Sequence, residues 1–206
     1  MYIPKAHEEL NSAVMHDLIR AYPLGCLVTL GQSGLTVNHI PFLIDSRVGE
    51  HGLLRAHVAR NNPLWQEPGA ETVAIFQGPD AYISPNWYPS KHQTAKAVPT
   101  WNYAVVHAHG HLKVIEDRDW LLQLVTELTN THERTQQLPW KVSDAPQDYL
   151  ERMLDMIVGI EIPVHKLVGK WKTSQNRTDP DRAGVVAGLT AQPGGLPMAD
   201  LVKNST

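Results

Sequence analysis

The chain has 206 residues and a formal net charge of −3, from 18 Lys and Arg against 21 Asp and Glu. This length suits one domain with its own core, and the charge offers no general basic surface for nucleic acid or an anionic membrane. Cys26 is the single cysteine, which excludes an intramolecular disulfide and a cysteine-based zinc or iron–sulfur site and is typical of a reducing cytoplasm.

The first segments predict a helix followed by a β-hairpin. Apolar residues recur every four positions over residues 8–22, and Pro23 ends the pattern. Two β-rich runs, 24–30 and 35–44, then flank the glycine-bounded loop 31–34, which includes Ser33. The N-terminal residues lack the basic and apolar regions of a signal peptide, and no apolar run is long enough to span a membrane, so we expect a cytoplasmic protein.

The rest of the chain is richer in strands than in helices. Helical patterns occur at 119–131 and 146–158, and the tail, 179–203, contains two short helix-like pieces. Further β-like runs are 52–59, 71–77, 81–84, 103–115 and 159–171. Six or more strands with few long helices between them favour an antiparallel sheet closed into a barrel. We therefore predict a single, mainly β domain over 1–206, with flanking helices.

A turn after the strand 52–59 carries several hydrogen-bond donors. His57, Arg60, Asn61 and Asn62 surround the start of a short helix, and fixed donors at a helix start suit a phosphate dianion. The alternative is a simple turn, with one asparagine as N-cap and Arg60 in solvent. The strand 35–44 adds Asn38 and His39 on opposite faces, and a lone strand histidine is often structural.

Two aromatic loops, around Trp87 and around Trp101-Asn102, are candidates for contact with a planar ligand. Eleven histidines and six tryptophans beside two phenylalanines are an excess of flat side chains with a polar edge. Such residues stack on ring systems, but they are also enriched in dimer interfaces and in lids over a core. Both interpretations stay open from the sequence.

The end of the last predicted strand, 171–177, collects further polar side chains, among them Lys172, Gln175 and Arg177. These side chains can bind a ligand, or they can form a polar exit loop that caps the next helix at Thr178 or Asp179.

His107, His109 and His111 alternate along one strand and share a face, a spacing that can serve a metal. No carboxylate lies on that strand, and such ladders also occur on solvated faces, so we predict no metal. The chain has no Walker loop, no G-x-G-x-x-G motif after a strand, no G-x-S-x-G elbow and no H-E-x-x-H motif, which disfavours the corresponding enzyme classes.

Six segments, in order along the chain, resemble the PaiB family of FMN-binding negative transcriptional regulators. The likeness extends from the first residue to about residue 201. The segments are MYIP (1–4), HIPF (39–42), HVARNNP (57–63), GPDAYISP (78–85), VPTWNY (98–103) and KTSQNR (172–177).

The resemblance implies an FMN-binding split β-barrel of the flavin reductase and pyridoxamine-phosphate oxidase type. It implies a homodimer with two FMN sites at the subunit interface. Asn38-His39 and residues 57–62 then form the phosphate-binding strand pair, with Arg60 on the phosphate. The other implied contacts are Trp87, Trp101 and Asn102 from the partner subunit and Gln175 with Arg177 at the last strand, while Lys172 or Arg177 is placed to stabilise the reduced flavin at its N1 and O2 edge.

The sequence leaves three candidate functions open. The first is an FMN-binding regulator, the second a flavin-dependent oxidoreductase, and the third a haem-binding or haem-degrading split-barrel protein. Direct DNA binding has little support, because there is no clear helix-turn-helix and the basic residues form only a short cluster at 166–177. No catalytic acid or base can be named.

Overall fold

The computed structural model describes residues 1–32 and 34–205. The chain divides into two compact units. Unit 1 comprises Met1–Ala21, Gln77–Val106 and Val168–Thr206, and unit 2 comprises Tyr22–Phe76 and His107–Leu167.

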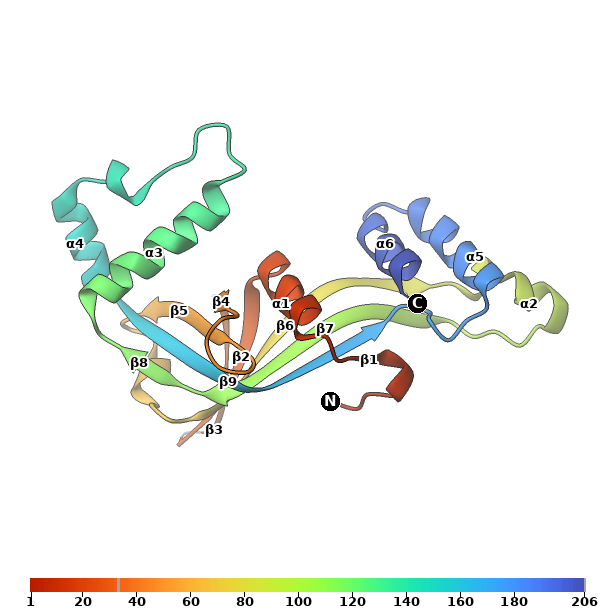
Figure 1. Cartoon of the computed structure of the whole chain (residues 1–206), viewed down its shortest axis with the longest axis horizontal. Helices are drawn as coiled ribbons and strands as arrows, with labels where there is room; N and C mark the ends of the chain where they lie inside the picture. Colours follow the sequence, from red (N-terminus) through yellow and green to blue (C-terminus); the bar gives the residue numbers. More distant parts are fainter. Residues whose placement is uncertain (33, 206) are drawn as a thin grey trace. The chain divides into compact units, whose positions relative to one another are not determined.

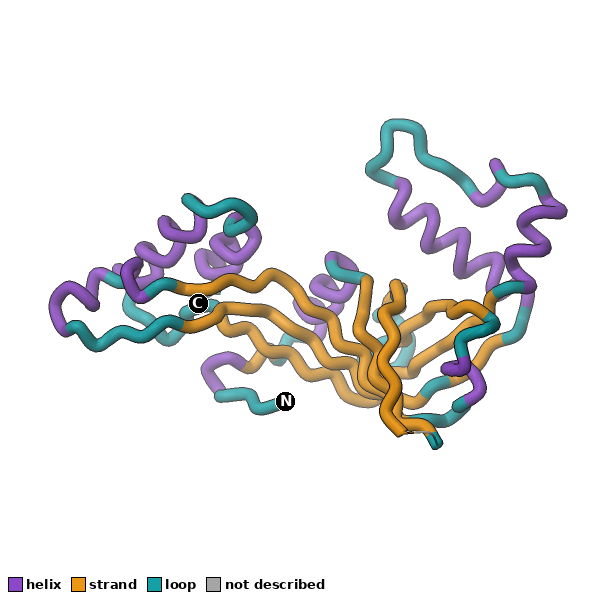
Figure 2. The backbone as a smooth tube through the Cα atoms, turned by 180° about the vertical axis from the view of Figure 1, so that it is seen from behind, coloured by secondary structure: helices purple, strands orange, loops and turns teal. Residues whose placement is uncertain are grey.

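The described strands form a sheet in the order β3-β2-β6-β7-β9-β5-β4, with β1 and β8 also paired to β9 (Figure 2, orange). The pairs β1–β9, β2–β3, β2–β6, β4–β5, β5–β9 and β8–β9 are antiparallel. The strands are β1 (Glu8–Glu9), β2 (Leu24–Gly31), β3 (Gly34–Pro41), β4 (Leu43–Asp45), β5 (Leu53–Ala59), β6 (Glu71–Ile83), β7 (Thr100–His111), β8 (Lys113–Ile115) and β9 (Ile157–Lys172). The long strands β6, β7 and β9 contribute residues to both units.

Buried and partly exposed side chains alternate along strand β5 of unit 2. Leu54, Ala56 and Val58 of β5 are buried on one face, which leaves Arg55 and His57 on the other. Phe42 and Phe76 meet edge to face in the core, with ring centroids 5.7 Å apart. A Cβ on Gly25 would lie 2.8 Å from the Phe76 ring, so only glycine fits there.

Two helices of unit 2 cover the other face of β5. These are α3 (Arg118–Glu133) and α4 (Gln147–Asp155), and the segment between them runs from the far end of α3 back to the start of α4, with a short 3₁₀ turn, η4 (Val142–Asp144) (Figure 1). The Asp117 side chain caps α3 by accepting a hydrogen bond from the Trp120 N–H at 2.8 Å.

In unit 1, helix α1 (Ser12–Ala21) packs closely on the strands. A Cβ on Gly78 would lie 2.9 Å from Leu18, and one on Gly169 would lie 2.7 Å from Met15. The helices α5 (Asp179–Thr190) and α6 (Leu196–Asn204) form a second apolar cluster with the end of β6, and a short helix, α2 (Pro89–Thr94), lies between β6 and β7. The cluster comprises Ile83, Tyr88, Val185, Leu189, Met198, Ala199 and Val202.

The described structure confirms the predicted strand-rich architecture, including the 24–44 hairpin, in which Gly31 pairs with Gly34. Ser33 of that loop lies outside the described residues. Five boundaries were wrong. The run 35–44 is two strands, because β4 pairs with β5 and not with β2, and the run 103–115 is also two strands, β7 and β8. The first helix begins at Ser12, because residues 8–9 pair with β9; the runs 71–77 and 81–84 are one strand; and the helix predicted over 146–158 ends at Asp155, where β9 follows. None of the helices described is long and apolar enough to cross a membrane.

Candidate functional site

The predicted site residues fall into two sets, one in each unit. Unit 2 holds Asn38, His39, His57, Arg60, Asn61 and Asn62. Unit 1 holds Trp87, Trp101, Asn102, Lys172, Gln175 and Arg177.

Asn38 and Asn62 of unit 2 come together. The Asn62 Nδ2 donates to Asn38 Oδ1 at 2.8 Å, while its Oδ1 accepts from the Leu64 N–H at 3.0 Å and so caps the 3₁₀ helix η2 (Pro63–Gln66). Both asparagines line a hollow of about 350 Å³, here called the Asn38 hollow, with Thr36, Val37, Pro63, Leu64 and Glu67. His39 and Asn61 are exposed and do not line it.

Arg60 is engaged by its own unit. Its guanidinium donates from Nε to the Asp155 carbonyl at 2.9 Å, from Nη1 to Glu116 at 3.1 Å and from Nη2 to the Ile157 carbonyl at 3.2 Å. It also lies 5.9 Å from the Trp65 ring centroid. The charge is therefore paired with a carboxylate, and a phosphate at this position would compete with Glu116.

His57 is separated from the asparagines. It lines a different hollow, which shares no residue with the Asn38 hollow and lies against α3 and α4. Burial lowers the pKa of the His57 imidazole below its usual range, so the ring is neutral near pH 7. Sequence reasoning grouped His57 with Arg60 and Asn62 because they are adjacent in the chain, but strand alternation points the histidine to the helix-covered face.

The cations of unit 1 differ from Arg60. The Lys172 Nζ donates to Thr100 Oγ1, the Lys170 Nζ donates to the Tyr2 carbonyl at 3.1 Å, and the Arg177 guanidinium lies 4.7 Å from the Tyr88 ring centroid. Within residues 1–32 and 34–205, none of the three forms an ion pair with a carboxylate.

Burial is the main cause that lowers the pKa of Lys172, and the like charges of Lys170 and Arg177 act in the same direction. Lys170 is only 8% exposed, and its ammonium lies 5.2 Å from the Tyr103 ring centroid. A buried lysine without a carboxylate partner is uncommon, because burying a charge is costly. Lys170 and Lys172 therefore carry positive charge that no carboxylate of the described residues pairs with.

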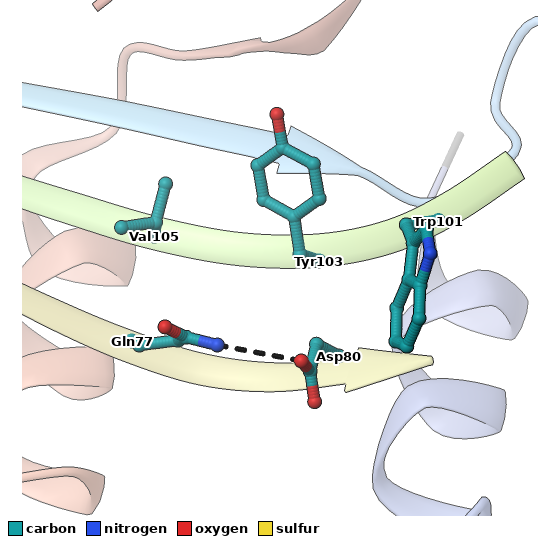
Figure 3. Close-up of a pocket in the computed structure, with 5 residues that line it drawn as sticks. All are labelled: Gln77, Asp80, Trp101, Tyr103 and Val105. Carbon is teal, nitrogen blue, oxygen red and sulfur yellow. Dashed lines mark hydrogen bonds between the residues drawn. The ribbon is translucent and has the colours of Figure 1, made fainter. Parts of the chain in front are cut away.

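An aromatic hollow lies in the same unit. Gln77, Asp80, Trp101, Tyr103 and Val105 line a space of about 310 Å³, here called the Trp101 hollow, and their side chains stand on one side of β6 and β7 (Figure 3). Trp101 is 55% exposed, although its ring meets that of Tyr82 edge to face at 6.0 Å. A largely exposed indole offers a flat surface for stacking.

The other predicted residues of unit 1 have structural partners. A Cβ on Gly188 would lie 2.3 Å from the Trp87 ring, which packs on α5. The buried Asn102 donates to Ser174 Oγ at 2.9 Å, and Gln175 accepts from the Thr173 N–H at 2.8 Å and donates to the Trp171 carbonyl at 2.6 Å. These bonds fix the loop that carries Arg177.

Sequence reasoning missed Lys170 and Tyr103 as members of this site. Strand alternation could have identified both residues, because residues two apart share a strand face. Lys170 lies two residues before Lys172 on one strand, and Tyr103 lies two residues after Trp101 on another.

The predicted histidine ladder separates into two pairs. The His107 and His109 ring centroids lie 6.4 Å apart, and His111 lies 5.4 Å from His165. Among the residues described, no group of three or more His, Cys, Asp or Glu could hold a metal ion.

Comparisons with known proteins identify the family of this chain. Residues 1–166 match the model of the family described as "Putative FMN-binding domain". An uncharacterized protein of Emericella nidulans is 35% identical over 92% of this chain and 90% of its own length. The Bacillus subtilis "Protease synthase and sporulation protein PAI 2" is 31% identical over 99% of this chain and 97% of its own.

A likeness to solved structures concerns the fold. The FAD and heme binding protein from Mycobacterium smegmatis superposes with a TM-score of 0.59 at 16% identity, covering 81% of this chain and 73% of that one.

Proposed function

Because this chain belongs to the PaiB family of FMN-binding proteins, with their mainly antiparallel split-barrel fold, we propose that it is an FMN-binding negative regulator of transcription. We propose further that it works as a homodimer, with each FMN bound by residues of two copies. Bound FMN supplies reversible electron and hydride transfer, while the protein provides binding, orientation and charge.

The observation that carries the proposal is the combination of free cations and flat rings in unit 1. FMN has a planar ring system and a phosphate dianion. Trp101 and Tyr103 provide aromatic surface, and Lys170 and Lys172 provide positive charge that no carboxylate neutralises within the described residues. The donor set therefore fits this cofactor.

Unit 2 contributes a different kind of contact to the proposal. Asn38 and Asn62, with the Thr36 hydroxyl, offer uncharged donors and acceptors at the Asn38 hollow, and the exposed His39 and Asn61 remain free for ligand contact. Arg60 keeps its predicted place near the phosphate only as a secondary contact, because Glu116 already pairs its charge.

Exposed apolar surface in unit 1 supports the homodimer. Tyr2 is 83% exposed, and Val98, Tyr82 and Trp101 are also exposed. Exposed aromatic side chains of this kind are enriched in interfaces between subunits. In the proposed homodimer, unit 2 residues of one copy and unit 1 residues of the other complete one FMN site.

Titration of the purified protein with FMN, followed by quenching of flavin fluorescence, tests cofactor binding. Lys172→Met should weaken binding about tenfold, as expected for one lost charge-assisted contact. Lys113→Met, at an exposed position on β8, is the matched control and should leave the affinity unchanged. Equal affinities of both variants and the unaltered protein would remove Lys172 from the site.

Two further measurements address the regulator and the dimer. Light scattering during size-exclusion chromatography should give twice the mass of one chain. Retardation of a fragment from the gene's own promoter region should occur and weaken with salt, because phosphate contacts release counterions. A monomer, or no retardation with FMN present or absent, would contradict these parts of the proposal.

The position of Lys172, which meets a hydroxyl and no carboxylate among the described residues, favours a second candidate, the flavin-dependent oxidoreductase, because a cation beside a flavin stabilises its reduced form. Anaerobic bleaching of the bound flavin by NADH or NADPH, with turnover on a second substrate, would support the oxidoreductase. A haem absorbance band after reconstitution would instead support a haem protein.

A further inference from the structure

Unit 2 has an apolar hollow that the flavin proposal does not use. It lies between the outer face of β5, the helices α3 and α4, and the segment that joins them (Figure 1). We call it the α3–α4 hollow. Its lining residues are His57, Val125, Thr129, Trp140, Val142, Ala145, Tyr149, Leu150, Met153, Leu154, Met156 and Ile157.

The walls of the α3–α4 hollow resemble those of a small-molecule site. Leu154 is 5% exposed and forms part of its inner wall, whereas Trp140 and Tyr149 are 47% and 49% exposed and stand at its opening. The hollow measures about 300 Å³. That is the lower end of the volume range of ligand pockets, roughly 300–1,000 Å³, which are lined by apolar and aromatic side chains with few polar groups.

His57 is the distinctive polar group on this wall. Its Nδ1 is shielded from solvent and has no hydrogen-bond partner in the described part of the chain. Leaving a buried polar atom unpaired destabilises a folded protein, and such atoms in native structures call for an explanation. His57 is therefore a polar side chain on the wall of the hollow whose Nδ1 no group of the described residues satisfies.

The side chains that line the α3–α4 hollow indicate which class of ligand it would bind. No lining side chain is a Lys, Arg, Asp or Glu, so the hollow offers no counter-ion. Burial lowers the pKa of His57, which keeps the imidazole neutral near pH 7. Two large aromatic side chains and two methionines at this site suit a flat, polarisable ring system.

We infer that the α3–α4 hollow is a second ligand site, which takes a small, uncharged aromatic molecule whose single hydrogen-bonding group meets the His57 imidazole. The hollow shares no lining residue with the Asn38 or the Trp101 hollow. Both ligands can therefore be bound at once. The inference does not depend on the regulatory role, since it rests on unit 2 alone.

A fluorescent probe of this chemistry tests the inference directly. N-Phenyl-1-naphthylamine is aromatic and uncharged, carries one N–H group and becomes brightly fluorescent in apolar sites. Titration of the full-length protein should give saturable binding with one probe per chain. Saturating FMN should leave the fluorescence in place.

Two variants locate the probe. Ala145→Trp should fill the hollow and abolish saturable binding, while Leu35→Trp, at an exposed position on β3, should not. His57→Phe keeps an aromatic ring but removes the polar contact, so binding should weaken about three- to tenfold. Circular dichroism and melting curves check folding, and Thr129→Trp replaces Ala145→Trp if that variant does not fold.

Several outcomes would overturn the inference. Non-saturable fluorescence, or equal binding by the Ala145→Trp and Leu35→Trp variants, would mean that the probe binds scattered surface. Displacement by FMN would assign the hollow to the flavin site. A protein that binds no probe but changes its molar mass on Ala145→Trp substitution uses the hollow as an interface between chains.

Discussion

The candidate-site cations of the two units have opposite surroundings. In unit 2, the Arg60 guanidinium makes hydrogen bonds to one carboxylate and two carbonyls. In unit 1, Lys170 and Lys172 meet a carbonyl, a hydroxyl and aromatic rings, with no carboxylate partner among the residues described. The first arrangement stabilises the protein itself, whereas the second leaves positive charge without a carboxylate partner, which is the basis of the proposed flavin site.

This difference shows that residue type alone does not reveal whether a cation already has a partner within the protein. The partners of Arg60 lie 56, 95 and 97 residues away along the chain, so only the folded structure brings them to its guanidinium. A functional cation is recognised by the absence of a neutralising neighbour as much as by its own charge.

The largest expected effect is on stability at Arg60. Arg60→Ala removes three hydrogen bonds and should lower the free energy of unfolding by about 2 kcal/mol, since each bond to a charged group contributes roughly 1.5 kcal/mol and the side chain is partly exposed. Urea denaturation measures the change. FMN affinity of the folded variant should fall less than threefold, and a tenfold loss of affinity with unchanged stability would restore Arg60 as the main phosphate contact.

Lys170 should show the opposite balance. Lys170→Met should weaken FMN binding about tenfold, while the free energy of unfolding stays the same or rises, because methionine is not charged and costs less to bury. Fluorescence titration and urea denaturation of the same preparation give both values. A large loss of stability with unchanged affinity would make Lys170 a structural residue like Arg60.

Most of the fold was accessible from the sequence, because alternating apolar residues and Gly or Pro breaks are local signals. The 24–44 hairpin and α3 are examples. The errors occurred where pairing over a long distance decides the structure. Residues 8–9 continue a helical pattern, but their pairing with Lys170 and Gly169 makes them a strand.

The candidate site was less accessible. Residue types alone identify the donor-rich segments, but the orientation of their side chains depends on packing. Asn38 and Asn62 meet, but not as a strand pair, because β3 and β5 are not neighbours in the sheet and Asn62 caps η2. His57 points to α3 and α4, and Trp87 is held against Gly188. Neither outcome could be deduced without knowing which helix covers which face.

The titration of His57 should have a smaller effect on the free energy of unfolding. It tests whether the imidazole is neutral in the folded protein. Because burial lowers its folded-state pKa, the unfolded chain takes up a proton first as the pH falls. Its contribution to stability is therefore complete above the ordinary histidine pKa of about 6.5 and is lost as the pH falls below that value.

His57→Phe should make the free energy of unfolding less dependent on pH between about 7.5 and 5.5, with a slope change below the limit of about 1.4 kcal/mol per pH unit for one proton. His39→Gln, at an exposed position, is the matched control. Urea denaturation across this range measures both. Equal slopes for the two variants would show that His57 is not the buried neutral group assigned here.

Substitution of Trp101 should have the smallest effect on stability, although its effect on FMN affinity should be clear. Its indole is mostly in solvent and makes only an edge contact with Tyr82, so Trp101→Ala should change the free energy of unfolding by less than about 0.5 kcal/mol. If the ring stacks on the flavin, FMN affinity should nevertheless fall about three- to tenfold, the value of one aromatic stack. Trp101→Phe should recover most of that loss, because it keeps a flat face without the indole N–H.

Trp140→Ala, a change of the same size at the half-exposed mouth of the α3–α4 hollow, should leave FMN affinity unaltered. Equal losses of FMN affinity from Trp101→Ala and Trp140→Ala would mean that the two hollows serve one ligand.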